Sequence, residues 1–367
     1  MRISFFVPKC SPENSHGRYV IELAKRLGSS NHVTVYAGSF ASPLGSLVRC
    51  RVLPILNRPA VLRLATLWSA AAVLPRKSRF DIVHVQGADA PVGDVVTAHC
   101  CNAAMRNVAG SGATVKRSLN YAIGAAAERY CLTRRGTRRV IAVSGRVKDD
   151  IERHYGVDAA KITVIPPGVD AEVFHPRNRA AVRRPTRERL GLARDDFVVV
   201  FVGRDHRVKG LGTLLEAVRR AGPGIRALVV GPTASPKFGV SRGGDVSFVG
   251  PTPDIAPFYA AADCFALPTR YDTFSLATLE AMASGLPVIV SRAAGVSEHL
   301  TDGVDALILE DASDASTLAL QLRRLVGDQA LRTHLGNAAR ETATRFSWER
   351  VVDRTVEVYR QAQRAPA

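Results

Sequence analysis

The sequence predicts an α/β protein with two Rossmann-like domains, each built on a doubly wound parallel sheet. Short apolar runs rich in β-branched residues alternate with amphipathic segments along the chain. The chain has 367 residues, which is long for one such sheet and sufficient for two. A polar, arginine-rich stretch near residues 170–192 separates the two series of runs. These three observations together favour two domains over one.

The apolar runs are the expected strands, and many of them end at Gly, Pro or Ser, as buried parallel strands do. In the first half they are Arg2–Val7, His32–Gly38, Asp81–Gly87, Val95–His99, Arg139–Ser144 and Ile162–Ile165. In the second half they are Val198–Gly203, Ala227–Gly231, Val246–Gly250, Cys264–Pro268, Pro287–Ser291 and Ala306–Leu309.

The alternation predicts four parts of the chain. Residues 1–170 form the first domain, 171–192 a linker, 193–344 the second domain and 345–367 a final helix. Open parallel sheets bind ligands at the carboxyl ends of their strands. If the two sheets face each other, the ligand lies in a cleft between the domains.

Composition restricts the compartment and the partners. The apolar start, Met1 to Pro8, is too short to be the hydrophobic region of a signal peptide. The apolar run Val61–Leu74 carries Arg63 and is too short to span a bilayer. Six scattered cysteines without a Cys-x-x-Cys pair are typical of reduced thiols, so we expect a cytoplasmic protein. The net charge of +17 favours anionic partners, although an arginine-rich genome explains it equally well. No helix-turn-helix, zinc spacing or aromatic RNA motif is evident, so we expect no nucleic-acid partner.

The first motif with chemistry is the loop from Gly203 to Gly210. It leaves an expected strand and enters a helix with apolar residues at i, i+3, i+4 and i+7 from Leu211. Arg204 and Lys209 lie in this loop, and a helix N-terminus beside two cations is a good site for a pyrophosphate. On this pattern alone, a solvated basic loop remains the alternative.

The second motif runs from Tyr271 to Val290. Ser275 is expected to cap a short helix that ends at Gly285, and Asp272 precedes this helix on the ligand side. Glu280 lies four residues after Leu276 and so shares a partly buried face. A carboxylate there needs specific partners, such as sugar or ribose hydroxyls. The alternative is an exposed surface glutamate.

The stretch from Asp272 to Val290 resembles the acidic-x7-Glu signature of retaining GT-B glycosyltransferases of family 4. Further segments resemble this family in the same order, over nearly the whole chain. They are Tyr19–Leu27, Asp81–Gln86, Val95–His99, Ile141–Ser144, Ile165–Asp170, Val202–Arg204 with Lys209–Gly210, Tyr259–Asp263 and Phe346–Glu349. In the family, a final helix like the one expected after Phe346 packs on the first domain.

The resemblance implies roles for residues of the second half. Arg204 and Lys209 would hold the donor diphosphate and stabilise its charge as it leaves. Glu280 would accept hydrogen bonds from the ribose, and Asp272 stands where a glutamate usually contacts the donor sugar. Backbone groups of the two loops would meet the sugar and the phosphates; they belong to Gly203, Thr273, Phe274, Ser275 and Leu276.

In the first half, the resemblance places His99 near the reacting sugar and Gly17 in a loop that approaches the diphosphate. Without it, a histidine at a strand end is more often structural. Two departures bear on these roles. Asp272 is one methylene shorter than the usual glutamate. Asn14 and Ser15 replace a pair of glycines, which weakens a close backbone approach to phosphate.

The expected function is transfer of a sugar from a UDP- or GDP-linked donor to a hydroxyl acceptor, a glycan or a lipid-linked precursor, with retention of configuration. No Asp-x-Asp occurs, so we expect no metal and no cofactor, with Arg204 and Lys209 stabilising the leaving group. Two alternatives are a nucleotide-sugar epimerase and a non-catalytic sugar-nucleotide-binding homologue.

A basic, partly apolar segment, Ala103 to Arg139, could contact an anionic membrane peripherally. The alternative is an ordinary helix with solvated basic residues. Its cations are Arg106, Lys116, Arg117, Arg129, Arg134, Arg135, Arg138 and Arg139.

Overall fold

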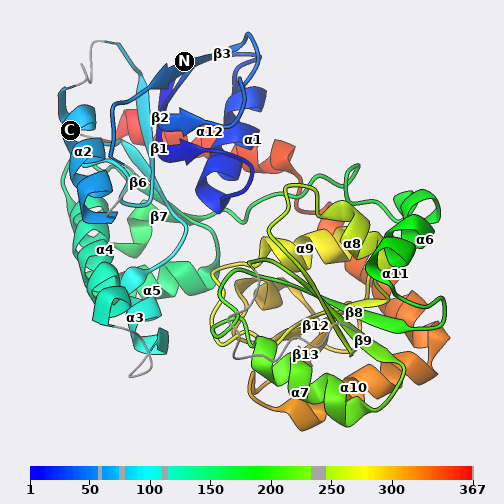
Figure 1. The fold of residues 1–367 in the computed structure, drawn as a ribbon. Helices are drawn as coiled ribbons and strands as arrows, with labels where there is room; N and C mark the ends of the chain where they lie inside the picture. The colour runs from blue at the N-terminus through cyan, green and yellow to red at the C-terminus, as the bar shows by residue number, and fades with distance from the viewer. Residues whose placement is uncertain (57–59, 74–78, 110–114, 233–244, 366–367) are drawn as a thin grey trace. The chain divides into compact units, whose positions relative to one another are not determined.

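The computed structural model describes residues 1–56, 60–73, 79–109, 115–232 and 245–365. The chain divides into two compact units. Unit 1 comprises Met1–Gly168 and Trp348–Ala367, and unit 2 comprises Val169–Ser347. Each unit contains one parallel sheet flanked by helices, so both are Rossmann-like (Figure 1).

Unit 1 has a seven-stranded sheet in the order β3-β2-β1-β4-β5-β6-β7, and all its strand pairs are parallel. The strands are β1 Arg2–Cys10, β2 His32–Phe40, β3 Val48–Val52, β4 Ile82–Gln86, β5 Val95–Ala98, β6 Arg139–Ala142 and β7 Ile162–Val164. The helices are α1 Ser15–Leu27, α2 Ala60–Val73, α3 Asn102–Ala109, α4 Val115–Thr133, α5 Gly145–Tyr155 and α12 Trp348–Arg364, with a 3₁₀ turn at Ala159–Lys161.

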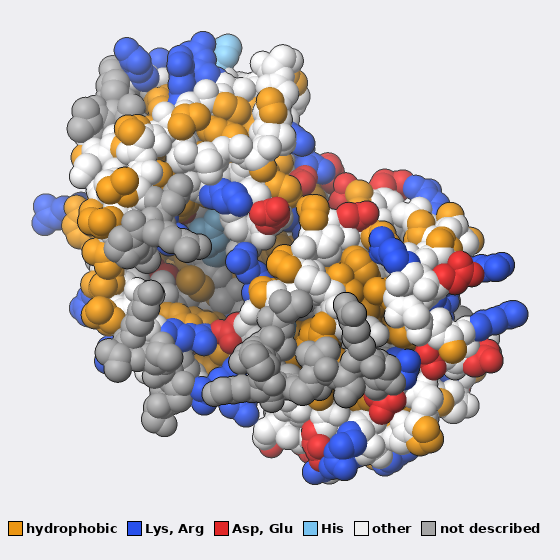
Figure 2. Space-filling model, in the orientation of Figure 1, with side chains coloured by type: hydrophobic (Ala, Val, Ile, Leu, Met, Phe, Trp, Pro, Cys, Tyr) orange, Lys and Arg blue, Asp and Glu red, His pale blue; other side chains and the backbone are white. Residues whose placement is uncertain are grey.

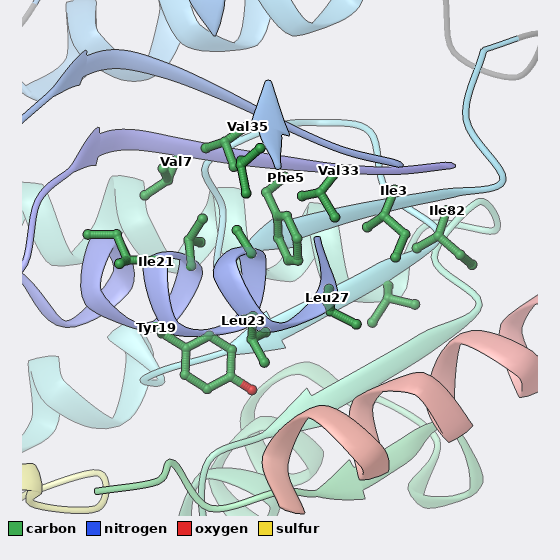
Figure 3. Packing of buried hydrophobic residues seen from close by; sticks show 14 of the residues in the cluster. Ile3, Phe5, Val7, Tyr19, Ile21, Leu23, Leu27, Val33, Val35 and Ile82 are labelled. Atoms are coloured by element: carbon green, nitrogen blue, oxygen red, sulfur yellow. The ribbon is translucent and has the colours of Figure 1, made fainter. Parts of the chain in front are cut away.

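The core of unit 1 lies between its sheet and α1 (Figure 3). Phe5 of β1 and Val35 of β2 point toward α1, whose Leu23 and Leu27 meet them. Helix α12, at the far end of the sequence, adds the buried rings of Trp348 and Tyr359 to the same cluster. The last helix of the chain is thus part of the first unit, because its apolar stripe is buried there.

Unit 2 has a six-stranded parallel sheet in the order β10-β9-β8-β11-β12-β13. The strands are β8 Phe197–Val202, β9 Ile225–Val230, β10 Val246–Val249, β11 Cys264–Leu267, β12 Val288–Ser291 and β13 Leu307–Leu309. The helices are α6 Asn178–Leu190, α7 Leu211–Ala221, α8 Ala256–Ala261, α9 Leu276–Ala283, α10 Ala315–Gly327 and α11 Gln329–Thr344, with a 3₁₀ helix at Gly295–His299.

The stretch 171–192, expected as a linker, is instead part of unit 2 and contains α6. Its arginines make specific contacts. Arg183 Nη1 lies 2.8–3.2 Å from the last three carbonyl oxygens around the end of α8, and Arg187 Nη2 lies 2.6 Å from the Asp263 carboxylate. These cations satisfy helix-end carbonyls and a half-buried acid. A polar composition therefore marks an attached helix here, not a free connection.

Strand β3 was not expected from the sequence. It is the edge strand of the unit 1 sheet and alternates Arg49 and Arg51 with less polar residues. Strands buried on both faces are apolar runs, whereas an edge strand that carries charge is not such a run. Among the described residues, no helix is long and apolar enough to cross a membrane, and this includes α2, which covers most of the run from Val61.

Candidate functional site

Three loops at the carboxyl ends of unit 2 strands are joined by backbone hydrogen bonds. In the β8–α7 loop, Val208 O accepts from Arg270 N of the β11–α9 loop at 2.8 Å. In the β12 loop, Gly295 N donates to Asp272 O at 2.9 Å. Both predicted motifs therefore lie at the same end of the sheet, as the sequence requires for one site.

An ion pair joins these two motifs. Lys209 Nζ lies 2.5 Å from Asp272 Oδ2, and the two side chains are only 22% and 12% exposed. Arg204, on the same loop as Lys209, is exposed. Asp272, the acid that precedes α9, therefore holds the Lys209 side chain in place. A ligand anion at this position has to share Lys209 with Asp272.

The N-terminus of α7 carries no side-chain cap. Its N-cap residue is Gly210, at φ 77°, and a side-chain β-carbon there would lie 1.8 Å from Pro268 O. Only glycine fits this close approach of the two loops. The first amide of α7, Leu211 N, donates to His206 O at 2.9 Å. No side chain of the N-cap occupies the next two amides, those of Gly212 and Thr213, and within the described residues they remain available to an anion.

Ser275 has a left-handed backbone at φ 83°, the one positive φ among the described non-glycine residues. It caps α9, since its Oγ accepts from Thr278 N at 3.4 Å and lies 2.8 Å from Thr278 Oγ1. Phe274 is buried against the rings of His299 and Phe346. This unusual backbone directly follows Phe274 and turns the chain from the loop into the helix. Such conformations are often found at ligand-binding loops.

Glu280 is buried, with 4% of its surface exposed, so the alternative of an exposed glutamate is wrong. Its Oε2 lies 3.0 Å from the hydroxyl of Tyr259, and that hydroxyl is also 3.0 Å from Ala277 O. A phenol has one proton to donate, so these two acceptors compete for it. Glu280 is thus held by Tyr259, whereas Lys209 is held by Asp272.

In unit 1, His99 follows β5 and is enclosed by other side chains. Its Nε2 lies 2.8 Å from Gln86 Oε1, its ring stacks on His16 at 4.3 Å, and Tyr19 lies edge-on at 5.0 Å. Burial, and then the nearby His16 and His84, lower the pKa of His99 well below its usual value. At neutral pH the ring is therefore uncharged, and Nε2–H donates to Gln86.

His16 and Asp89 were missed by the sequence reasoning. His16 Nδ1 lies 3.4 Å from Asp89 Oδ2, which connects Asp89 to His99 through the stacked rings. Burial raises the pKa of Asp89, and the bond to His16 opposes that shift. Both residues lie after the adjacent strands β1 and β4, and that placement is the signal that could have identified them.

Gly17 lies where the helix α1 meets its preceding loop. Its N–H donates to Asn14 Oδ1 at 2.5 Å, and a β-carbon would lie 2.6 Å from backbone atoms of Lys9 and Ser11. Asn14, noted above as a departure, is therefore the N-cap of α1. Gly17 is required by this close packing, whether or not a ligand approaches.

The basic segment 103–139 separates into two groups. Some of its arginines make structural contacts: Arg138 Nη1 donates to Ala362 O at 3.0 Å, and Arg117 binds the Tyr121 hydroxyl at 3.0 Å. The Lys116 side chain lies outside the described residues. The exposed group contains Arg106, Arg129 and Arg135, with Leu119 and Tyr130.

Two family profiles match the chain. "Glycosyltransferase Family 4" matches residues 16–173, and "Glycosyl transferases group 1" matches residues 196–328. Among curated proteins, a D-inositol 3-phosphate glycosyltransferase of Segniliparus rotundus is 34% identical over 62% of this chain and 53% of its own length. One from Xylanimonas cellulosilytica is 33% identical over 62% of this chain and 58% of its own. The chain spans about half the length of these relatives.

Solved structures show the same fold. WaaG, a glycosyltransferase involved in lipopolysaccharide biosynthesis, has a TM-score of 0.82 at 21% identity, over 97% of this chain and 99% of its own. Anabaena Alr3699/HepE, solved with UDP and glucose, has a TM-score of 0.74 at 20% identity, over 97% and 98%. At such identities the likeness concerns the fold alone. The family profiles and the fold agree with the signature from Asp272 to Val290, and the chain belongs to the GT-B glycosyltransferases of family 4.

Proposed function

We propose that this protein transfers a sugar from a nucleoside-diphosphate donor to a hydroxyl group of an acceptor. The observation that carries the proposal is the uncapped N-terminus of α7 next to the Lys209–Asp272 pair. Both lie at the carboxyl edge of a parallel sheet, where such folds bind nucleotides. A solved structural neighbour, Anabaena Alr3699/HepE, was captured with UDP-glucose.

The charge that develops in this reaction is negative and lies on the diphosphate. When the bond between the sugar C1 and the diphosphate oxygen breaks, the electron pair stays with the oxygen. In the proposal, Lys209, Arg204 and the amides of Gly212 and Thr213 at the start of α7 stabilise that charge, and preorganised donors of this kind lower reaction barriers strongly. In the proposal, Asp272 positions Lys209 and contacts the donor sugar.

The remaining predicted residues take supporting roles in the proposal. Glu280, oriented by Tyr259, accepts hydrogen bonds from the ribose hydroxyls of the donor. Neutral His99 contacts the reacting sugar as a hydrogen-bonding group. Its Nε2 side is fixed by Gln86, so the ring orientation is set before a ligand binds.

Two kinds of acceptor are candidates for this reaction. The curated relatives are named for D-inositol 3-phosphate, which makes a phosphorylated polyol one candidate. A glycan or lipid-linked precursor is the other, because WaaG is described as acting in lipopolysaccharide biosynthesis. Assays with both acceptors and a panel of UDP- and GDP-sugars decide between them.

The test measures nucleotide release. A donor is first identified by thermal shift, since a bound ligand stabilises the folded protein. We then expect UDP or GDP to be released when acceptor is added, to remain unreleased without it, and to be unaffected by EDTA. The anomeric configuration of the product, measured by NMR, tests retention. Epimerised sugar without nucleotide release would identify an epimerase instead.

One observation favours a second candidate, a non-catalytic sugar-nucleotide-binding homologue. Asp272 already neutralises Lys209, which reduces the positive charge offered to a diphosphate. In that case a donor shifts the melting temperature, but no acceptor from either class triggers nucleotide release.

A further inference from the structure

A hollow of 680 Å³ lies on unit 1, and none of the predicted site residues lines it. It is formed where β1 and β2 begin and where the chain enters β4, so it lies toward the amino ends of these strands. His99 and Gly17 follow the carboxyl ends of strands in the same sheet. The side chains that define the hollow are Arg2, Arg49, Arg51, Arg79, Tyr36 and Phe80.

The register of the edge strands explains why the arginines gather there. Arg49 pairs with Thr34 and Arg51 with Tyr36, so both arginines share one face of the sheet with these residues. Val35, which lies between Thr34 and Tyr36 on β2, belongs to the core cluster under α1. The hollow therefore lies on the sheet face opposite to α1.

The charged residues that line the hollow are all arginines. No Asp or Glu is among its lining residues. Arg2 pairs with Asp81 at 2.8 Å, but within the described part of the chain no hydrogen bond or ion pair is formed by the guanidinium groups of Arg49, Arg51 or Arg79. Figure 2 shows Lys and Arg side chains gathered at this end of unit 1, over β3 and the start of the chain. Neighbouring like charges repel, so an anion that bridges them is stabilising.

An aromatic group forms part of the hollow. The Tyr36 ring stacks on Phe6 at 5.0 Å and 13°, and Phe80 meets Tyr36 edge-on at 6.2 Å. Such packed rings are rigid and give the carbon part of a ligand an apolar contact. Guanidinium groups bind phosphate oxygens bidentately, which a single ammonium cannot do.

We propose that this hollow is a binding site for a phosphate ester, held by Arg49, Arg51 and Arg79 with its carbon part against Tyr36. Its residues all belong to unit 1 and none is shared with the proposed donor site, so it does not depend on the proposed transferase activity. The phosphate can belong to a soluble phosphorylated molecule or to a phospholipid headgroup, and the experiment separates these sources.

The test uses His32, which lines the hollow, as a local reporter. The full-length protein is titrated with inorganic pyrophosphate at low salt, and the His32 ring signal is followed by NMR, assigned by its loss in His32→Gln. We expect a saturable shift. Arg49→Ala/Arg51→Ala should weaken it at least about tenfold, the effect of losing one or two charge-assisted hydrogen bonds.

The matched control is Arg153→Ala/Arg324→Ala, which removes the same charge from exposed positions outside the hollow. It should retain wild-type affinity. If the Arg49/Arg51 variant fails to fold, Arg79→Ala, which lies outside the sheet, serves in its place. Equal affinities in the hollow and control variants, or no saturation in the wild type, would overturn the proposal.

A second arm identifies the source of the phosphate. Protein is sedimented with vesicles of phosphatidylcholine alone or with added phosphatidylglycerol. Binding to the anionic vesicles that is lost in Arg49→Ala/Arg51→Ala assigns the site to a lipid headgroup. A pyrophosphate-dependent His32 shift combined with vesicle binding that is absent, or unchanged by the substitutions, assigns it to a soluble phosphate ester.

Discussion

The β1–α1 loop of unit 1 and the β8–α7 loop of unit 2 occupy equivalent places and differ in what fills them. Both follow an inner strand of a parallel sheet and lead into a helix. In unit 1, Asn14 caps α1 by accepting from Gly17 N at 2.5 Å. In unit 2, Gly210 precedes α7 and offers no side-chain cap.

The cations near the two loops differ as well. Lys9 in unit 1 pairs with Glu13 at the surface at 3.2 Å, whereas Lys209 in unit 2 is three-quarters buried and paired with Asp272. A helix N-terminus attracts anions only while its amides are unoccupied. The same topology thus leaves amides at the helix N-terminus uncapped by a side chain in unit 2, whereas in unit 1 the Asn14 side chain caps the helix.

The largest expected effect tests the β8–α7 loop of unit 2. Replacing Lys209 with alanine removes the buried cation that we assign to the leaving diphosphate. We expect turnover to fall by about 100-fold or more, as for other preorganised charge-stabilising donors. The measurement is acceptor-dependent nucleotide release. The control is Arg324→Ala on α10, which should keep wild-type turnover. A folded Lys209→Ala protein with full turnover would remove this residue from the site.

The next effect concerns the glycine that keeps α7 uncapped. Gly210→Ala forces a positive φ and a contact of 1.8 Å with Pro268 O, so the two loops must separate. We expect the free energy of unfolding to fall by about 3 kcal/mol or more. Gly156→Ala is the matched control, because its φ is 69° and no atom lies within 4 Å. Gly156→Ala should lower the free energy of unfolding by only about 1 kcal/mol. Similar losses in chemical denaturation would show that the loop contact is not tight.

The strands beside β1 and β8 differ in one buried side chain. Strand β4 carries His84 in the core, between the Tyr359 hydroxyl and Thr97 Oγ1, each at 2.7 Å, whereas the equivalent β11 carries no histidine. Burial lowers the pKa of His84 to about 3. Between pH 3 and about 6.5 the unfolded chain therefore binds more protons than the folded one.

The stabilising contribution of neutral His84 is complete above about pH 6.5 and is lost as the pH falls toward 3. In this range the free energy of unfolding falls by up to about 1.4 kcal/mol for each unit by which the pH is lowered. We expect the free energy of unfolding, measured by chemical denaturation between pH 7 and 4, to depend less steeply on pH in His84→Gln than in the wild type. The difference between the two slopes should be about 1.4 kcal/mol per pH unit. Parallel pH profiles for the two proteins would mean that His84 is protonated without unfolding unit 1.

The smallest effect tests the β1–α1 loop of unit 1. Asn14→Ala removes the cap of α1 and should lower the free energy of unfolding by about 1 kcal/mol, whereas Asn14→Gly should cost a few tenths. Asn14→Gly also frees Gly17 N–H, so it should bind inorganic phosphate at least as well as the wild type. Unchanged stability in both variants would contradict the capping role.

The sequence predicted most of the fold because its buried strands are continuous apolar runs. Twelve expected runs correspond to strands of the two sheets, and the helix from Leu211 and the Ser275-capped helix formed as expected. The two elements that were not predicted carry polar sequences. Strand β3 carries arginines at an exposed edge, and α6 carries arginines that bind Asp263. Neither has the apolar pattern on which the prediction depended.

The sequence by itself determined the family signature, the two sheets and the residue types that gather at the carboxyl ends of their strands. Only the tertiary structure decided the partners: Lys209 with Asp272, Glu280 with Tyr259, and His99 with Gln86. The physical reason is range. Strand and helix patterns follow from neighbouring residues, whereas an ion pair or hydrogen bond depends on distances of a few ångströms between loops that only the folded sheet brings together.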